Sequence, residues 1–148
     1  MKVGIGCDHG GIVLKDACFS ALNKLDIEYV DYGTYTQDSV DYPDYAKKVA
    51  LAVINGEVDK GILLCGTGIG ISIAANKFKG IRCAHITNVF SAKASAEHNN
   101  ANIIAMGGRI TTQDEAEAMV IAFFSTNFAE GRHQIRLDKI TEIERNYL

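Results

Sequence analysis

The chain has 148 residues, of which 47% are hydrophobic and 22% are charged, and its formal net charge is −3. These values are typical of one soluble globular domain with a hydrophobic core. The basic residues are dispersed, which argues against nucleic acid as the main partner. No apolar run approaches the roughly 20 residues of a membrane-spanning helix, so we expect no membrane association.

The four cysteines are Cys7, Cys18, Cys65 and Cys83, and they form neither a CxxC pair nor a regular spacing. Disulfide frameworks and zinc sites both need closer pairing, so we expect free thiols in a reducing cytoplasm. Three of them are expected to fill core space. No cluster of His, Cys, Asp and Glu has metal-ligand spacing, and the sequence therefore predicts no metal.

Short apolar runs alternate with amphipathic stretches along the chain, a pattern typical of βαβ units around a parallel sheet. The apolar runs predict five strands: Lys2–Cys7, Glu28–Tyr32, Lys60–Cys65, Ile81–Ile86 and Ile103–Met106.

Helical spacing of apolar residues predicts the segments between and after these strands. The helices are expected at residues 14–25, at 42–55, after Cys65, at 89–98, from Thr112 onward and at 135–146. Thr112 and Glu115 have the spacing of a capping box. Residues 129–133 are polar and are expected to form a loop. The final helix follows this polar connection and could clasp a neighbouring subunit or pack on its own domain.

Ligands of open α/β sheets bind at the carboxyl ends of the strands. Three of the predicted strands end in polar or glycine-rich segments, namely Cys7–Gly11, Cys65–Gly70 and Gly107–Arg109. The helix after the fourth strand ends in Glu97–Asn100, which carries His98 and Asn99. We expect all of these groups to gather on one edge of the sheet.

The segment Gly66-Thr67-Gly68-Ile69-Gly70 can turn its backbone N–H groups toward an anion. It lacks the GxGxxG spacing of a dinucleotide site and the Lys-Ser/Thr pair of a P-loop, so the anion should be small or should develop during a reaction. A tight turn without a ligand is the alternative interpretation.

Cys65 precedes this segment, where a helix N-terminus favours the thiolate as a nucleophile or a proton-abstracting base. The alternative is a small apolar residue at the end of a buried strand. His98 has a side chain suited to proton exchange near neutral pH, or it is a helix-end residue without a role.

Asp8 and His9 suit the recognition of sugar hydroxyls better than a pyrophosphate, which a carboxylate would repel, although a plain turn remains open. Arg132 and Arg136 lie four residues apart and could hold a phosphate if the segment is helical; otherwise they form a solvated surface. Arg109 is a third candidate, whereas His85 is expected to be a hydrogen-bonded core residue.

In chain order, the motifs are Asp-His-Gly-Gly, Asp-Tyr-Pro, Cys-Gly-Thr-Gly-Ile-Gly-Ile-Ser-Ile-Ala-Ala-Asn-Lys, Glu-His-Asn, Gly-Gly-Arg and Gly-Arg-His-x-x-Arg. This series resembles B-type ribose-5-phosphate isomerases and their relatives, the allose-6-phosphate and galactose-6-phosphate isomerases. The resemblance covers essentially the whole chain, residues 1–148, as a single isomerase domain.

The resemblance implies a Rossmann-like α/β/α sandwich without metal or organic cofactor. It also implies a homodimer, or a dimer of dimers, with active sites across the interface and a C-terminal helix that reaches the partner subunit. Cys65 matches the base, the N–H groups of Gly66–Gly70 match the enediolate pocket with Thr67 nearby, and His98 matches the ring-opening group. The matching substrate or phosphate contacts are Asp8, His9, Asn99, Arg109, Arg132 and Arg136.

Three other functions remain open from the sequence. The closest is isomerisation of another aldose or of a hexose 6-phosphate, such as allose or galactose 6-phosphate. The others are a non-catalytic sugar-phosphate binding module and a thiol hydrolase that forms an acyl-Cys65 intermediate.

Overall fold

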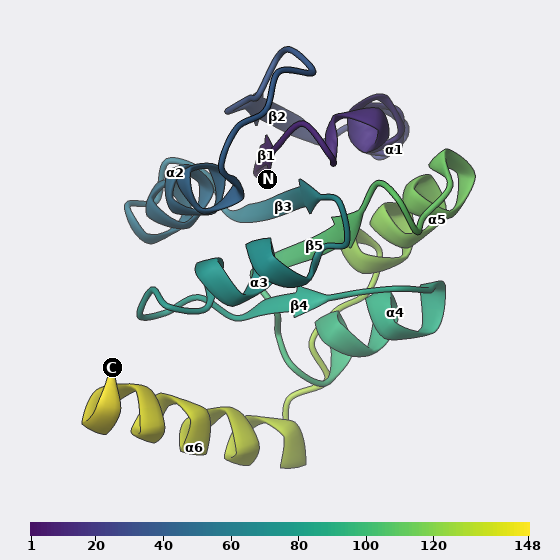
Figure 1. The fold of residues 1–148 in the computed structure, drawn as a ribbon. Coiled ribbons are helices and arrows are strands. Elements are labelled where there is room, and N and C mark those ends of the chain that lie inside the picture. The colour runs from purple at the N-terminus through teal and green to yellow at the C-terminus, as the bar shows by residue number, and fades with distance from the viewer.

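The computed structural model describes residues 1–148, and its strands and helices alternate along the chain (Figure 1). The five strands are β1 (Lys2–Cys7), β2 (Glu28–Asp31), β3 (Lys60–Cys65), β4 (Cys83–His85) and β5 (Ile103–Gly107). The six α-helices are α1 (Lys15–Lys24), α2 (Tyr42–Ile54), α3 (Ile69–Ala75), α4 (Val89–Glu97), α5 (Gln113–Phe124) and α6 (Arg132–Tyr147). A single 3₁₀ turn, Ile12–Leu14, leads into α1.

Local sequence explains where several helices begin. Thr112 accepts a hydrogen bond from the Glu115 backbone while the Glu115 side chain returns to the Thr112 backbone, which confirms the predicted capping box. Asn88 and Ser91 form a second capping box at the start of α4. Pro43 lies in the first turn of α2, where a missing backbone N–H does no harm.

All strand pairs in the sheet are parallel, and the strand order is β2-β1-β3-β5-β4. The chain moves outward from β1 to β2 and then crosses back to β3 on the other side of β1. The direction of winding therefore reverses between β1 and β3, and such a switch point opens a crevice at the carboxyl ends of the two strands.

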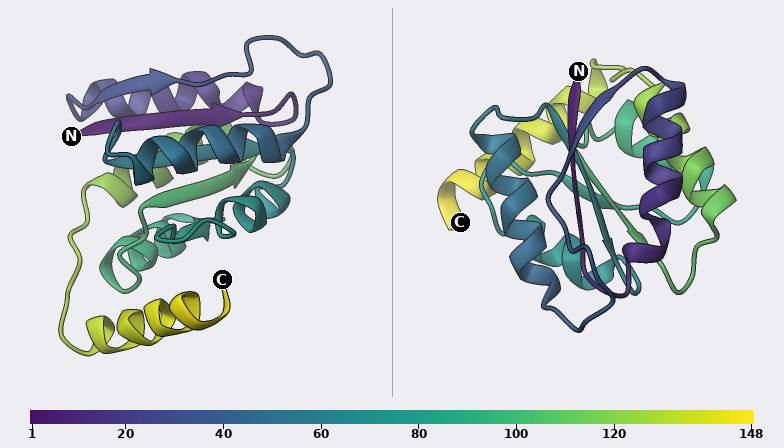
Figure 2. Two further views of the ribbon diagram at one scale, coloured as in Figure 1. Left: turned by 90° about the vertical axis from the view of Figure 1, so that its left-hand side faces the viewer. Right: turned by 90° about the horizontal axis from the view of Figure 1, so that it is seen from above.

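Helices cover both faces of this sheet, which confirms the predicted three-layer Rossmann-like α/β fold (Figure 2). On one face, α1, α4 and α5 contribute to a core cluster of 21 buried residues. On the other face, α2 and α3 contribute to a cluster of 10. Because β3 lies at the centre, its residues Ile62, Leu63 and Leu64 are fully buried, as expected for a parallel strand covered on both sides.

Two predicted elements differ from the structure by more than one residue, and the others agree to within one residue at each predicted end. The fourth strand covers only Cys83–His85 instead of Ile81–Ile86, because β4 is an edge strand that pairs with β5 alone. The final helix begins at Arg132, three residues before the predicted start. Gly131 precedes it with φ of +56°, a backbone conformation that favours glycine, so the expected loop ends there.

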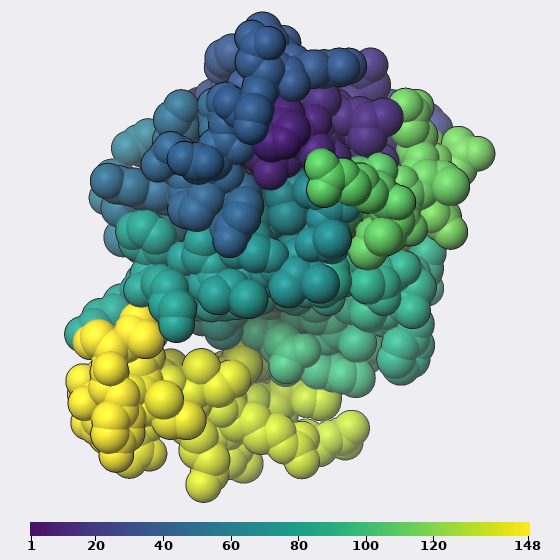
Figure 3. All heavy atoms as spheres, in the orientation of Figure 1, coloured from purple at the N-terminus to yellow at the C-terminus, as the bar shows by residue number.

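Helix α6 stands apart from the sandwich, and Leu137 is its only buried residue (Figures 1 and 3). Its exposed apolar side chains are Ile135, Ile140, Ile143 and Tyr147, and the exposed Leu148 follows its last residue. One hydrogen bond, from the Gly80 backbone N–H to Glu144 Oε1 at 2.7 Å, ties its C-terminal half to the body. None of the helices is both long and apolar enough to cross a membrane.

Candidate active site

The loops that follow β1, β3 and β5 are joined by backbone hydrogen bonds at the switch point. The Asp8 N–H donates to the Leu64 carbonyl at 3.1 Å. The N–H groups of Gly108 and Arg109 donate to the carbonyls of Cys65 and Gly66 at 2.8 and 2.9 Å. These bonds fix the three loops relative to one another.

Glycine is required where these loops touch. A Cβ on Gly108 would lie 2.2 Å from the Gly10 carbonyl oxygen, and a Cβ on Gly11 would lie 2.3 Å from the Leu64 carbonyl carbon. Both distances are far below van der Waals contact, and the obstructing atoms belong to the backbone. The glycines therefore allow an approach that larger residues would prevent.

Cys65 ends β3 and is 4% exposed, at the mouth of the glycine-rich segment. Its Sγ accepts a hydrogen bond from the Gly68 backbone N–H at 3.0 Å. Gly68 has φ of +79°, a left-handed conformation that favours glycine, in the turn that leads into α3. The chain thus places one thiol directly beside a backbone donor of the glycine-rich segment.

The other three thiols are disfavoured as thiolates by their burial. Burial raises the pKa of Cys7 to about 11 and the pKa values of Cys18 and Cys83 to about 12. These thiols are therefore protonated near neutral pH and fit the predicted space-filling role. The chain contains no group of three or more His, Cys, Asp or Glu side chains placed to hold a metal ion.

The glycine-rich segment is supported from β4 by His85. His85 Nε2 lies 2.9 Å from the Thr67 carbonyl oxygen, and a Cβ on Gly68 would lie 2.8 Å from the imidazole Cδ2. The predicted hydrogen bond of His85 is confirmed. The side chain is only half-buried, however, because its partner is the loop and not the core. The Thr67 hydroxyl accepts from the Ile69 N–H at 3.2 Å, which orders the turn into α3.

Asp8 and His9 lie in the loop after β1. Asp8 is buried, and its Oδ1 accepts from the N–H groups of Gly10 and Gly11 at 2.8 and 3.0 Å, so one carboxylate oxygen organises the loop. The His9 Nδ1 accepts from the Val40 N–H at 3.2 Å. Both side chains keep a second polar atom, Asp8 Oδ2 and His9 Nε2, that makes no hydrogen bond within the chain.

Two more side chains lie against the glycine-rich segment. A Cβ on Gly66 would lie 2.7 Å from Arg109 Nη1, so the Arg109 guanidinium lies directly over Gly66. A Cβ on Gly70 would lie 2.6 Å from the Tyr42 ring. Sequence reasoning did not select Tyr42, although the Asp-Tyr-Pro motif that contains it was noticed.

We call the set Asp8, His9, Cys65–Gly70 and Arg109 the sheet-edge site.

A second group of polar side chains surrounds the C-terminal end of α4. The His98 and His133 rings are stacked, with centroids 4.4 Å apart and an interplanar angle of 11°. Burial, then the charges of His98, Arg132 and Arg136, lower the pKa of His133. We call His98, Asn99, Arg132, His133 and Arg136 the helix-end cluster. Sequence reasoning missed His133 as a member, although it lies between the two arginines.

The expectation that Glu97–Asn100 lies on the same edge of the sheet as the strand-end segments was wrong for a single chain. Helix α4 runs antiparallel to the strands, so its C-terminal end lies at their amino ends (Figure 1). The hydrogen bonds agree: the Gly61 N–H, at the start of β3, donates to the Asn102 carbonyl, and the Ala129 N–H donates to the Glu97 carbonyl. The helix-end cluster and the sheet-edge site therefore lie at opposite edges.

Comparisons with known proteins agree with this architecture. The model of the family described as "Ribose/Galactose Isomerase" matches residues 3–140. Ribose-5-phosphate isomerase B of Escherichia coli is 47% identical over 143 residues, which cover 97% of this chain and 96% of that protein.

Two solved structures extend the similarity to three dimensions. Ribose-5-phosphate isomerase B of Clostridium thermocellum superposes with a TM-score of 0.96 at 51% identity, and the match covers 100% of both chains. The enzyme of Mycoplasma genitalium, solved with bound ribulose-5-phosphate, superposes with a TM-score of 0.92 at 39% identity over 98% of this chain and 97% of that one. The chain belongs to the Ribose/Galactose Isomerase family.

Proposed function

We propose that the protein is an aldose–ketose isomerase that interconverts ribose 5-phosphate and ribulose 5-phosphate through an enediolate. The observation that carries this proposal is the position of Cys65, whose Sγ lies 3.0 Å from the Gly68 nitrogen at the start of the glycine-rich segment. The substrates named for the similar proteins of E. coli and M. genitalium support the choice of a pentose phosphate.

In the proposed reaction, the Cys65 thiolate removes the proton from C2 of the open-chain aldose. The electron pair moves toward O1, and the negative charge is met by backbone N–H groups of Gly66–Gly70, with the Thr67 hydroxyl nearby. Donors preorganised for such a charge are worth about 2.7–4 kcal/mol each in well-studied enzymes. The Cys65 proton then returns to C1, and the O2 proton passes to O1, which completes the ketose.

We propose that the remaining groups come from a second copy of the chain in a homodimer, or in a dimer of dimers. A sugar phosphate carries about two negative charges near neutral pH. The sheet-edge site offers the guanidinium of Arg109 but also the carboxylate of Asp8. The two further candidate phosphate ligands, Arg132 and Arg136, lie at the opposite edge of the same chain, so they can reach a sheet-edge site only in a partner.

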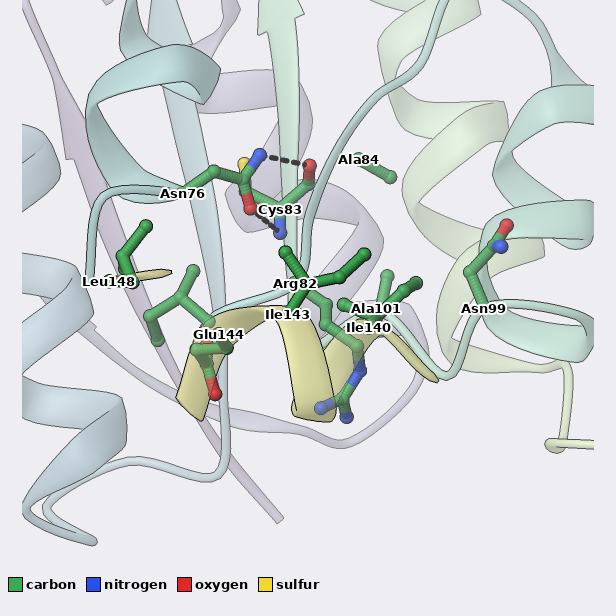
Figure 4. Close-up of a pocket in the computed structure, with 11 residues that line it drawn as sticks. Asn76, Arg82, Cys83, Ala84, Asn99, Ala101, Ile140, Ile143, Glu144 and Leu148 are labelled. Atoms are coloured by element: carbon green, nitrogen blue, oxygen red, sulfur yellow. Dashed lines mark hydrogen bonds between the residues drawn. The ribbon is translucent and has the colours of Figure 1, made fainter. Parts of the chain in front are cut away.

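The groove between α6 and β4 supports this dimer (Figure 4). Its volume is about 450 Å³, and its apolar lining includes Ile81, Ala101, Ile140, Ile143 and Leu148. Ile81 and Ala101 are already buried, but in a single chain Ile140, Ile143 and Leu148 remain exposed to water, as does Ile135. Their exposure costs about 25 cal/mol per Å² of apolar surface. A partner seated here would bury that surface and bring the helix-end cluster to the other active site.

Within this dimer, His98 would open the furanose ring by proton exchange with the ring oxygen, and Asn99 would contact a sugar hydroxyl. Residues 1–148 would act as one catalytic domain. A cytoplasmic location fits the four free cysteines.

Turnover of ribose 5-phosphate by the wild type, by Cys65→Ala and by the matched control Cys83→Ala tests the proposal. We expect Cys65→Ala to lose about 10²–10⁴-fold in kcat, the usual contribution of a general base, and Cys83→Ala to stay near wild type, both with a chelator present.

Three results would contradict the proposal in different ways. Turnover of allose or galactose 6-phosphate without turnover of the pentose would change the substrate. Binding of sugar phosphates without any turnover would indicate a binding module. Full activity in Cys65→Ala would remove the proposed base.

A further inference from the structure

Lys15, at the start of α1, has a buried ammonium group, which is rare for lysine unless the charge is paired. Its Nζ lies 2.9 Å from Asp31 Oδ2, donates to the Thr34 carbonyl and lies 4.8 Å from the centre of the Tyr35 ring. The side chain is 8% exposed, so little solvent screens the ion pair. The proposed reaction gives no role to either member of this pair.

Asp31 uses its remaining polar atoms to shape the loop that follows β2. Its Oδ1 accepts from the Gly33 N–H at 2.9 Å, and its carbonyl accepts from the Tyr35 hydroxyl at 2.9 Å. Two backbone bonds, from the Cys7 N–H to the Gly33 carbonyl and from the Thr34 N–H to the Cys7 carbonyl, attach this segment to the end of β1. Residues 31–35 are therefore fixed around the Lys15 ammonium.

The far end of the same loop contacts a residue of the sheet-edge site. After exposed residues 36–39, the Val40 backbone N–H donates to His9 Nδ1 at 3.2 Å. Because Nδ1 accepts, a neutral His9 carries its proton on Nε2. The free Nε2–H is then a hydrogen-bond donor, which suits an oxygen lone pair of a sugar phosphate.

We propose that Lys15 and Asp31 are positioning residues that act through the loop of residues 32–41 and hold His9 in the Nε2–H tautomer as a donor to the sugar phosphate. The identity of the ligand in this inference rests on the proposed function. The tautomer of His9 does not depend on it. The ion pair fixes one end of the loop, and the Val40 N–H transmits that position to the imidazole. Without the pair, the exposed middle of the loop would leave Val40 free to move away from His9.

Nitrogen-15 NMR of the histidine side chains measures the tautomer directly and does not require activity. In the wild type, His9 should show an acceptor-type Nδ1 and a protonated Nε2. Lys15→Met and Val40→Pro should both shift His9 toward an averaged mixture of tautomers. Proline has no N–H, so Val40→Pro removes the donor itself. Ser39→Pro, at an adjacent exposed position whose N–H makes no hydrogen bond, is the matched control and should leave the spectrum unchanged.

Kinetics provide a second measurement on the same variants. Lys15→Met and Val40→Pro should lower kcat/KM for ribose 5-phosphate by about 10- to 100-fold, because small misplacements of a substrate-positioning group have effects of that size. Lys15→Arg, which keeps the charge, should recover most of the loss. If Lys15→Met does not fold, Asp31→Asn is the alternative variant. The side-chain amide oxygen at position 31 can still accept from the Gly33 N–H, whereas the ion pair with Lys15 is lost.

The inference is overturned if His9 keeps its tautomer in the folded Lys15 or Asp31 variant, or if Ser39→Pro changes the spectrum as much as Val40→Pro. Failure of the proposed function has a different signature, namely a wild type that shows the expected His9 spectrum and does not turn over ribose 5-phosphate.

Discussion

In the sheet-edge site, Asp8, His9 and Cys65 each accept a hydrogen bond from a backbone N–H, whereas the two arginines of the helix-end cluster lie on an exposed helix. Cys65 accepts from Gly68, Asp8 accepts from its own loop, and His9 accepts from Val40. Arg132 and Arg136, in contrast, are exposed and make no hydrogen bond through their side chains.

This difference shows which part of the chemistry a single chain can organise. Stabilising a charge that appears in a transition state requires donors fixed in advance, and in our proposal the glycine-rich segment supplies them. Recognition of a phosphate tolerates more motion, because long cationic side chains can adjust to it. In our proposal, therefore, the rigid site belongs to one chain and the adjustable one arrives with its partner.

The strongest test of this division is complementation between two inactive variants. We expect Cys65→Ala and His98→Ala homodimers each to be inactive. When the two chains are co-expressed, each heterodimer should contain one site with both an intact Cys65 and an intact His98. Random pairing in a twofold dimer then gives about a quarter of wild-type activity. Turnover of ribose 5-phosphate by the purified mixture measures it.

The control is a double variant, Cys65→Ala with His98→Ala, co-expressed with each single variant. No intact site can form in those mixtures, so they should remain inactive. Absence of activity in the first mixture as well, although mass spectrometry detects heterodimers, would place both residues of each active site in one chain and refute the shared site.

Substitutions of two glycines, Gly66 in the sheet-edge site and Gly108 beside it, should separate effects on stability from effects on substrate binding. In Gly108→Ala the new Cβ meets the backbone oxygen of Gly10 at 2.2 Å, and overpacking of this kind lowers the free energy of unfolding by about 1–3 kcal/mol. In Gly66→Ala it meets the end of the flexible Arg109 side chain at 2.7 Å, which can move. We expect that variant to unfold near the wild-type denaturant concentration but to have a raised KM.

Urea unfolding and KM for ribose 5-phosphate distinguish the two variants. Equal destabilisation in both would show that Arg109 is as rigid as the backbone beside it.

Sequence reasoning predicted the fold and the sheet-edge site because both depend on local patterns. Strand β3 is a continuous apolar run that ends at Cys65, and the glycine spacing after it defines the loop. Strand ends of a parallel sheet necessarily meet at one edge, so Asp8, Cys65 and Arg109 could be grouped without coordinates.

The same reasoning failed where position depends on direction or on tertiary contact. His98 ends a helix, not a strand, and a crossover helix returns its C-terminal end to the opposite edge. The contacts of Lys15 could not be predicted, because its partners Asp31 and Thr34 lie in another part of the chain and no periodic pattern links them. Arg132 was assigned to a loop because the polar residues around Gly131 conceal the start of α6.

Thiol labelling tests whether the rigid site also contains the reactive cysteine. At pH 8, a thiol with a pKa of about 11 or 12 is ionised to only about 10⁻³–10⁻⁴, so native Cys7, Cys18 and Cys83 should resist iodoacetamide. We expect one label per chain, at Cys65, by mass spectrometry. Cys83→Ala should keep that label and Cys65→Ala should lose it, whereas a label on Cys83 before Cys65 would contradict the assignment.

The smallest expected effect is a pH dependence of the helix-end cluster. Because the pKa of His133 is lowered from its ordinary value near 6.5, protonation opposes the folded arrangement. The contribution of the neutral ring is complete above pH 6.5 and is lost as the pH falls below that value, since the unfolded chain then binds more protons. Amide hydrogen exchange in the first turns of α6 should therefore accelerate modestly as the pH falls from 7 to 5.5. The rates are measured relative to those of α5 to correct for intrinsic exchange.

The control is His133→Phe, which keeps an aromatic ring against His98 but does not titrate. Amide exchange of α6 in this variant should depend less on pH. If both proteins respond equally, another group controls how α6 docks.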